Sequence, residues 1–371
     1  MRFKLFSILT LLPLTMSAAT IQKSDFGKTA DGAAVALYTI KNGKGMEAKI
    51  ITYGGAIVSL KTPDRTGAMG DIVLGYDTLA EYTAGKSYFG ALIGRYGNRI
   101  AHGKFTLDGK AYSVPVNNGE NALHGGIRGF DKRVWTAREL PDGALELTYK
   151  SKDGEEGYPG NLAATVTYTL TDANTLRIHY IATTDKPTVL NLTNHSYFNL
   201  KGAGDGDILG HLVTLNADEY LPVDAGLIPT GELRLVDGTP FDFRHGRTPG
   251  ERISQPDQQL KLGNGYDHNW ILNRPEMGPG MLSLAARVEE TGVSGRIMEV
   301  YTDQPGIQFY TGNFLDGTDK GKGGKVYNQH AGFCVETQHY PDSPNKPSFP
   351  STILRPGQKY DTTTEFRFSA K

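Results

Sequence analysis

The sequence contains a single cysteine, Cys334, in 371 residues. One cysteine excludes an internal disulfide framework and a cysteine-based zinc site. The 39 Lys and Arg residues almost balance the 40 Asp and Glu residues, leaving a formal net charge of −1. This balance gives no electrostatic reason to expect nucleic acid or an anionic membrane as a partner. Walker-type and H-E-x-x-H motifs are also missing, so nothing in the sequence predicts a bound metal or cofactor.

Long apolar runs are missing after the first twenty residues, so no later stretch could cross a membrane. The start of the chain differs, because Arg2 and Lys4 precede an apolar run over residues 5–14 and small residues at 17–19. A positive start, a short apolar run and small residues at its end are typical of a secretory signal peptide. We predict a signal peptide over residues 1–19. Residues 20–371 would then form a periplasmic protein without a membrane anchor.

Helix-forming periodic runs are scarce, whereas glycine (46 residues) and aromatic residues (10%) are frequent. This composition favours a β-rich protein with many turns. Alternating apolar and polar residues predict strands at 34–40, 46–53, 145–149, 163–170 and 175–183. The turn at 172–174 joins the last two as a hairpin. We therefore expect one large antiparallel, all-β domain.

Residues 190–200 (LNLTNHSYFNL) have an unusual pattern for a strand. With a two-residue period, one face carries leucines and Phe198, while the other carries Asn191, Thr193, His195, Tyr197 and Asn199. Two explanations are open at this point. The polar face could lie in water, as antiparallel sheets often allow, or it could line a cleft in which His195 works near neutral pH.

Other polar residues lie in segments far apart in the sequence. They are Asn98 and Arg99 in a glycine-rich stretch, His124 before two glycines, Asp267, Gln308 and Glu336. Glu336 stands out because it lies in an apolar strand, where a carboxylate is costly to bury unless it is hydrogen-bonded or catalytic. The alternative for Glu336 is a structural ion pair with Arg95 or Arg99.

Six motifs in order give the chain a resemblance to the aldose 1-epimerase (galactose mutarotase) family. They are GRYGNRI at 94–100, NALHGG at 121–126, NLTNHSYFNL at 191–200, YDHN at 266–269, PGIQFYTGN at 305–313 and ETQHYPDSPN at 336–345. The segment Tyr96-Gly97 departs from the small aliphatic residues of the family, and Ala122 occupies a variable position. The resemblance implies a galactose mutarotase-like β-sandwich, or supersandwich, with an open cleft for a hexopyranose.

The resemblance also implies roles for particular residues. Glu336 matches the general base and His195 the general acid, while Asn98, Arg99, His124, Asp267 and Gln308 match sugar-binding positions. Tyr197 shares the face of His195, so we expect it in the same cleft. Exchange of α and β anomers needs one acid and one base and no metal or cofactor. Trp270 and Phe309 are expected to stack on the sugar ring.

Three other functions remain open on the sequence. A non-catalytic carbohydrate-binding protein of the same fold would keep Arg99 and Asp267 but could lose the acid or the base. A glycosidase would use two carboxylates, and Asp267 and Glu336 could form that pair. A hexose-phosphate epimerase would be expected inside the cell. The expected partner is a small aldose sugar such as D-glucose or D-galactose, and no pattern indicates an oligomeric state.

Overall fold

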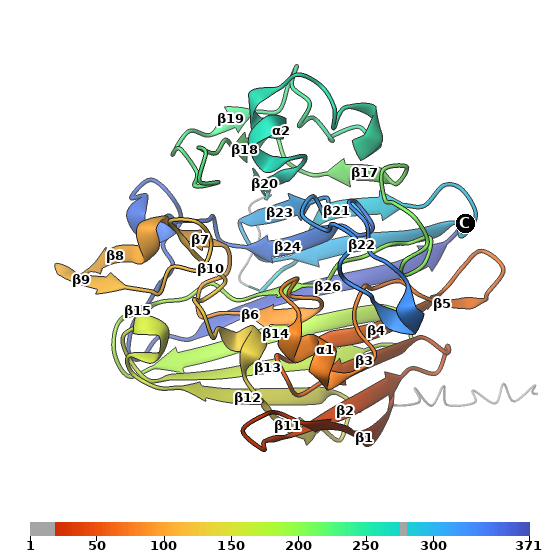
Figure 1. Cartoon of the computed structure of the whole chain (residues 1–371), viewed down its shortest axis with the longest axis horizontal. Helices are drawn as coiled ribbons and strands as arrows, with labels where there is room; N and C mark the ends of the chain where they lie inside the picture. Colours follow the sequence, from red (N-terminus) through yellow and green to blue (C-terminus); the bar gives the residue numbers. More distant parts are fainter. Residues whose placement is uncertain (1–18, 275–279) are drawn as a thin grey trace, which may run out of the picture.

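Three antiparallel sheets dominate the computed structural model of the chain, which describes residues 19–274 and 280–371 (Figure 1). The all-β architecture expected from the composition is confirmed. The predicted signal peptide lies outside the described residues except for Ala19, the last residue before β1 (Thr20–Lys28). Within the two described ranges, no helix is long and apolar enough to cross a membrane.

The largest sheet has eight strands in the order β11-β12-β13-β14-β26-β22-β21-β17. Their bounds are β11 Thr136–Glu139, β12 Leu145–Ser151, β13 Leu162–Leu170, β14 Thr175–Thr184, β17 Leu212–Leu215, β21 Ser283–Glu289, β22 Arg296–Thr302 and β26 Tyr360–Ala370. The predicted hairpin is confirmed, since Leu170 pairs with Leu176 across the β13–β14 turn. Every second side chain of β13, from Leu162 to Leu170, is buried. One face of this sheet therefore forms the core.

Two five-stranded sheets supply the rest of the sandwich. The N-terminal sheet runs in sequence order through β1, β2 Ala34–Lys41, β3 Glu47–Ile51, β4 Ile57–Pro63 and β5 Met69–Asp71. The second runs in the order β19 Arg234–Leu235, β18 Glu219–Leu221, β20 Asp267–Ile271, β23 Gly306–Tyr310 and β24 Cys334–Gln338. In Figure 1 the two sheets lie toward opposite ends of the molecule.

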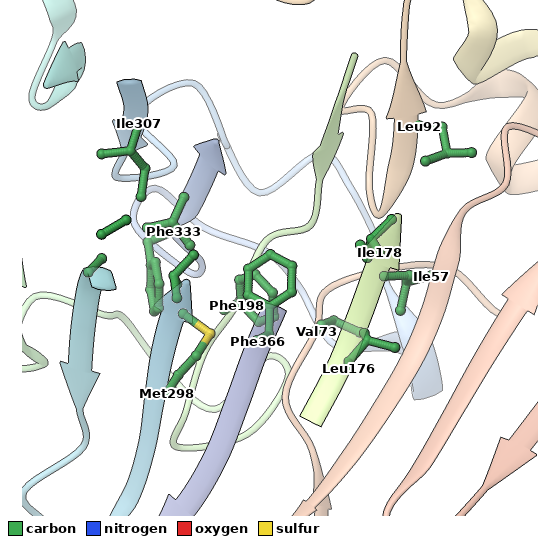
Figure 2. Close-up of a cluster of buried hydrophobic side chains, with 14 of the residues drawn as sticks. Ile57, Val73, Leu92, Leu176, Ile178, Phe198, Met298, Ile307, Phe333 and Phe366 are labelled. Atoms are coloured by element: carbon green, nitrogen blue, oxygen red, sulfur yellow. The ribbon is translucent and has the colours of Figure 1, made fainter. Parts of the chain in front are cut away.

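One cluster of buried hydrophobic residues joins all three sheets. It contains Ile57 from the N-terminal sheet, Ile178 and Phe366 from the large sheet, and Ile307 from the second five-stranded sheet. Figure 2 shows these side chains together with Phe198, whose ring lies 5.3 Å from that of Phe366. The two smaller sheets thus pack on the same side of the large one, which leaves their other faces free to build a site.

The segment 191–200 connects the two smaller sheets. Its regular part is only β16 (Thr193–His195), which pairs with β6 (Ala91–Ile93). Further along, Phe198 forms bridges to Val73 on one side and to Phe333 on the other. The predicted strand over 190–200 is therefore too long, because the chain changes partners within it. The solvated-face explanation is wrong, since all eleven residues are buried.

Short elements complete the chain around these sheets. The two-stranded pairs are β7 Arg99–Ile100 with β10 Ala122–Leu123, β8 Lys104–Leu107 with β9 Lys110–Ser113, and β15 Thr188–Val189 with β25 Ile353–Leu354. Helix α1 (Leu79–Ala84) begins with a capping box between Thr78 and Glu81, and α2 (Gln258–Gly263) begins with Asp257 as its cap. The β7–β10 pair matters most, because it carries Arg99 beside the loop of His124.

Candidate active site

A cavity of about 330 Å³ gathers most of the predicted site residues. Its lining includes Asn98, Arg99, His124, His195, Tyr197, Asp267 and Glu336. These residues come from β7, β16, β20, β24 and adjoining loops, so they are far apart in the sequence. Gln308 differs from this group: it is on the same face of its sheet but is buried and is not among the lining residues.

The second five-stranded sheet forms one wall of the cavity. Asp267 on β20 lies opposite Tyr310 on β23, which lies opposite Cys334 on β24. Gln308 likewise lies opposite Glu336. Paired residues in an antiparallel sheet point to the same face, so these side chains share the cavity side. As alternation predicts, His268 points the other way and contacts Gln259 in the interior, at 3.1 Å.

The aromatic residues on the other face of this sheet do not contact the cavity. Trp270 and Phe309 were expected to stack on a sugar, but both are fully buried in the hydrophobic core. The indole N–H of Trp270 donates to the Phe241 carbonyl at 3.0 Å. The physical reason is strand alternation, because Trp270 and Phe309 point away from the cavity-facing Asp267 and Tyr310.

His195 and Glu336 form a buried acid–base pair at the cavity. His195 Nε2 lies 3.6 Å from Glu336 Oε1, and both side chains are almost completely inaccessible to solvent. Burial lowers the pKa of His195 to about 4 and raises the pKa of Glu336 well above its usual range. The charge of Asp267 raises the Glu336 pKa further, whereas Arg99 opposes the shift. Both groups are therefore neutral together over a wide pH range.

His124 is held in one tautomer beside this pair. The backbone N–H of Asn98 donates to His124 Nδ1 at 3.1 Å, so the neutral ring carries its hydrogen on Nε2. The ring lies edge-on to His195, with centroids 5.1 Å apart. Burial, and then the charges of His195 and Arg99, keep the His124 pKa well below its usual value. His124 is thus a neutral hydrogen-bond donor at the centre of the site.

Arg99 and Asp267 supply opposite charges on one side of the cavity. Arg99 Nη2 lies 3.7 Å from Asp267 Oδ2, and Arg99 Nε donates to Asn118 Oδ1 at 3.1 Å. Gln308 Nε2 donates to Asp267 Oδ1 at 2.8 Å. A guanidinium beside a carboxylate offers donors and acceptors for neighbouring hydroxyl groups.

Arg95 belongs to the scaffold and not to the site. Its guanidinium is buried and donates to the carbonyls of Ser151, Lys152 and Pro159. The sequence alternative that paired Glu336 with Arg95 is wrong, because the hydrogen bonds of Arg95 hold the end of β12 instead.

Several cavity residues escaped the sequence analysis. They are Lys86, Ser87, Tyr88, Asn118, Leu123, Leu227, Tyr310, Phe314 and Leu315. Tyr88 has a positive φ of 56° and its ring packs against His124, with centroids 4.8 Å apart. Tyr310 could have been found, because strand alternation puts it on the face of Gln308. The loop residues had no such pattern.

His124, His195 and Glu336 also have the spacing of a metal site, with ligand atoms within 4.8 Å of one another. The tautomer of His124 argues against this use. Its Nδ1 lone pair accepts the Asn98 N–H, so Nε2 holds a hydrogen and has no lone pair for a metal. The cluster therefore fits donation of hydrogen bonds and protons better than coordination.

Comparison with known proteins agrees with this geometry. The aldose 1-epimerase family model matches residues 36–367. Galactose mutarotase of Sus scrofa is 49% identical over 94% of this chain and 99% of its own length. Aldose 1-epimerase of Escherichia coli K12 is 40% identical over 92% of this chain and 97% of its own. The crystal structure of galactose 1-epimerase from Lactobacillus acidophilus has a TM-score of 0.83 at 28% identity, covering 95% and 99% of the two chains. The chain belongs to the aldose 1-epimerase family and is an isomerase of that carbohydrate-active class.

Proposed function

We propose that the protein interconverts the α and β anomers of hexopyranoses such as D-glucose and D-galactose, with Glu336 as general base and His195 as general acid. The observation that carries this proposal is the buried pair itself, with 3.6 Å between His195 Nε2 and Glu336 Oε1. One acid and one base at a single cavity are what anomer exchange requires.

The reaction moves two protons and breaks one bond. Glu336 takes the proton of the anomeric hydroxyl, the C1–O5 bond breaks, and His195 gives its proton to O5. Rotation about C1–C2 and the reverse transfers close the ring on the other face. The reacting form, a carboxylate beside an imidazolium, holds the same number of protons as the neutral resting pair and arises by a proton shift from Glu336 to His195. Ring opening then converts both residues back into neutral groups. Because burial disfavours charge on both residues, the site favours this step.

The remaining lining residues would hold the sugar for this transfer. His124 offers a neutral N–H beside His195, and the Arg99–Asp267 pair can bind neighbouring hydroxyls. Asp267 is already engaged by Arg99 and Gln308, which supports a binding role over that of a second catalytic carboxylate. This argues for an epimerase and against the glycosidase.

Polarimetry of freshly dissolved α-D-glucose and α-D-galactose tests the proposal. We expect faster mutarotation than in buffer, and a loss of about 10²–10⁴-fold in kcat for Glu336→Gln and for His195→Asn. If mutarotation is no faster than in buffer with any common aldose, the enzyme proposal fails and the protein is a sugar-binding protein. Release of reducing sugar from aryl glycosides would favour the glycosidase.

We also propose that residues 1–19 are a signal peptide and that the mature enzyme works in the periplasm. This is supported by the start of β1 at Thr20, directly after the predicted leader. Cell fractionation and N-terminal sequencing of the mature protein test it. An intact Met1 on protein recovered from the cytoplasm would refute it.

A further inference from the structure

Both ring nitrogens of His195 have a partner on strand β24. His195 Nε2 lies 3.6 Å from Glu336 Oε1, and His195 Nδ1 lies 3.5 Å from the sulfur of Cys334. Only Val335 separates Cys334 from Glu336 on β24, so the side chains of these two residues point to the same face of the sheet. One strand therefore contacts both edges of the imidazole ring, with a carboxyl group at one nitrogen and a thiol at the other.

Aromatic rings hold the imidazole of His195 in this orientation. The centroid of the Tyr197 ring lies 5.0 Å from that of His195 with 33° between the planes, and the Tyr88 ring lies 5.7 Å away at 31°. The ring of His124 meets it edge-on. Because His195 is buried among these rings, a rotation of its imidazole would have to displace closely packed neighbours. Nδ1 is thus kept at the thiol and Nε2 at the carboxyl group.

The chemistry of the two partners decides which ring nitrogen carries the hydrogen. When His195 and Glu336 are both neutral, the carboxylic acid can pass its proton to Nε2 only if Nε2 has a free lone pair. The hydrogen of neutral His195 must then be on Nδ1, where the sulfur of Cys334 can accept it. The backbone carbonyl of His195, which lies on the Nδ1 side of the ring, also favours a hydrogen on the ring.

We propose that Cys334 is a positioning residue that holds neutral His195 in the Nδ1–H tautomer, so that Nε2 alone exchanges protons with Glu336 and the sugar. Nε2 takes the proton of Glu336 and gives it to O5 as the C1–O5 bond breaks, while Glu336 takes the proton of the anomeric hydroxyl. Nδ1 keeps its hydrogen throughout. The thiol gives up no proton, because burial raises the pKa of Cys334 well above its usual value.

This inference rests on the proposed role of His195 as general acid and adds a residue that does not touch the reacting atoms. Cys334 is completely buried and is not among the residues that line the cavity. It acts through His195 alone. With the hydrogen on Nε2 instead, two hydrogens would face each other between His195 and Glu336, and the first proton shift would be blocked.

NMR of the sugar-free protein tests the tautomer without reference to activity. Near neutral pH the ring of His195 is uncharged, because burial lowers its pKa to about 4. Long-range proton–nitrogen-15 spectra, in which the His195 signals are identified by their loss in His195→Asn, should show the hydrogen on Nδ1 in the natural protein. Cys334→Ala should show an Nε2–H or mixed tautomer. Cys334→Ser, whose hydroxyl oxygen is also an acceptor, should keep the Nδ1–H tautomer.

Two results of this experiment would overturn the proposal, even if mutarotation is fast. One is an Nε2–H tautomer in the natural protein, and the other is an unchanged Nδ1–H tautomer in Cys334→Ala. Val335→Ala is the matched control, since Val335 lies beside Cys334 on β24 but points into the hydrophobic core. It also removes buried atoms, yet it leaves both partners of His195 in place and should keep the natural tautomer.

Mutarotation rates should follow the tautomer. For Cys334→Ala we expect kcat to fall about fivefold, as for the loss of one hydrogen bond, with KM within about twofold of the natural value. Cys334→Ser and Val335→Ala should keep kcat. A natural kcat in Cys334→Ala would overturn the proposal and leave Cys334 a packing residue.

Two further measurements separate this inference from other failures. If circular dichroism shows that Cys334→Ala is unfolded, Cys334→Val replaces it, because valine fills the space of the thiol and has no polar atom. If the natural protein shows no mutarotation, the proposed function fails, whereas the NMR spectra still confirm or refute the contact of Cys334 with His195 Nδ1.

Discussion

His195 Nε2 and Glu336 Oε1 lie 3.6 Å apart in a place that water hardly reaches. The two side chains come from β16 and β24, which lie side by side because Phe198 forms a bridge to Phe333 just beyond them. The backbone hydrogen bonds between Phe198 and Phe333 thus hold the segments of His195 and Glu336 next to each other. This relation also determines how the enzyme should respond to pH.

The pair should hold one proton over a broad pH range. Burial lowers the pKa of His195 to about 4 and raises that of Glu336, so the second proton binds only near pH 4 and the last one leaves well above the usual carboxylate range. We expect kcat/KM to be flat around neutral pH and to fall with decreasing pH through about 4. Polarimetry at each pH, corrected for the spontaneous reaction, measures this. An acid limb near the ordinary histidine pKa of about 6.5 would contradict it.

His124 should act through its Nε2–H and not as a titrating acid. The Asn98 N–H occupies Nδ1, and the pKa of His124 lies well below its usual value. We expect His124→Gln, whose amide can replace the donor at Nε2, to keep about 5- to 30-fold more kcat/KM than His124→Ala, since a buried hydrogen bond is worth about 1–2 kcal/mol. Nitrogen-15 NMR should find the Nε2–H tautomer at pH 6. An imidazolium at that pH would show the assignment to be wrong.

More of the candidate site than of the loops around it could be predicted from the sequence. Alternation along 163–170 and 175–183 predicts the β13–β14 hairpin, and the same rule separates Asp267 from His268. The same alternation places Trp270 and Phe309 in the core. The wrong expectation that they stack on the sugar came from their aromatic character and not from the strand pattern. The loop residues Tyr88 and Phe314 could not be predicted, because only tertiary packing brings their loops to the cavity.

Trp270 should matter for stability and not for sugar binding. It is completely buried, and its N–H bonds to the Phe241 carbonyl. Trp270→Phe leaves that carbonyl without its donor and opens a small cavity, which should cost about 2–4 kcal/mol in the free energy of unfolding. Urea denaturation measures the loss. KM should stay within twofold of the natural value, and a large rise would restore the stacking role.

Phe314, at the mouth of the same cavity, should matter for sugar binding and not for stability. Its side chain is 58% exposed and its ring stacks on Tyr310, with centroids 6.2 Å apart. Phe314→Ala should leave the free energy of unfolding within about 0.5 kcal/mol, as exposed substitutions usually do. KM should rise by several-fold through lost contact with the sugar. If urea denaturation shows a large loss of stability and KM is unchanged, Phe314 has no part in binding.

The buried carboxyl group of Asp131 should make the free energy of unfolding depend on pH. It lies in the 3-10 turn Phe130–Lys132, and burial raises its pKa from 3.8 to about 6 despite Lys132 nearby. Between these values the folded protein binds the proton more tightly than the unfolded chain, so this residue lowers stability as pH rises. Asp131→Asn removes the effect. The free energy of unfolding of Asp131→Asn, minus that of the natural protein, should increase by roughly 3 kcal/mol between pH 4 and about 6 and then stay constant. Urea denaturation at intervals across this range measures the difference, and a difference independent of pH would mean that Asp131 is not buried as a carboxyl group.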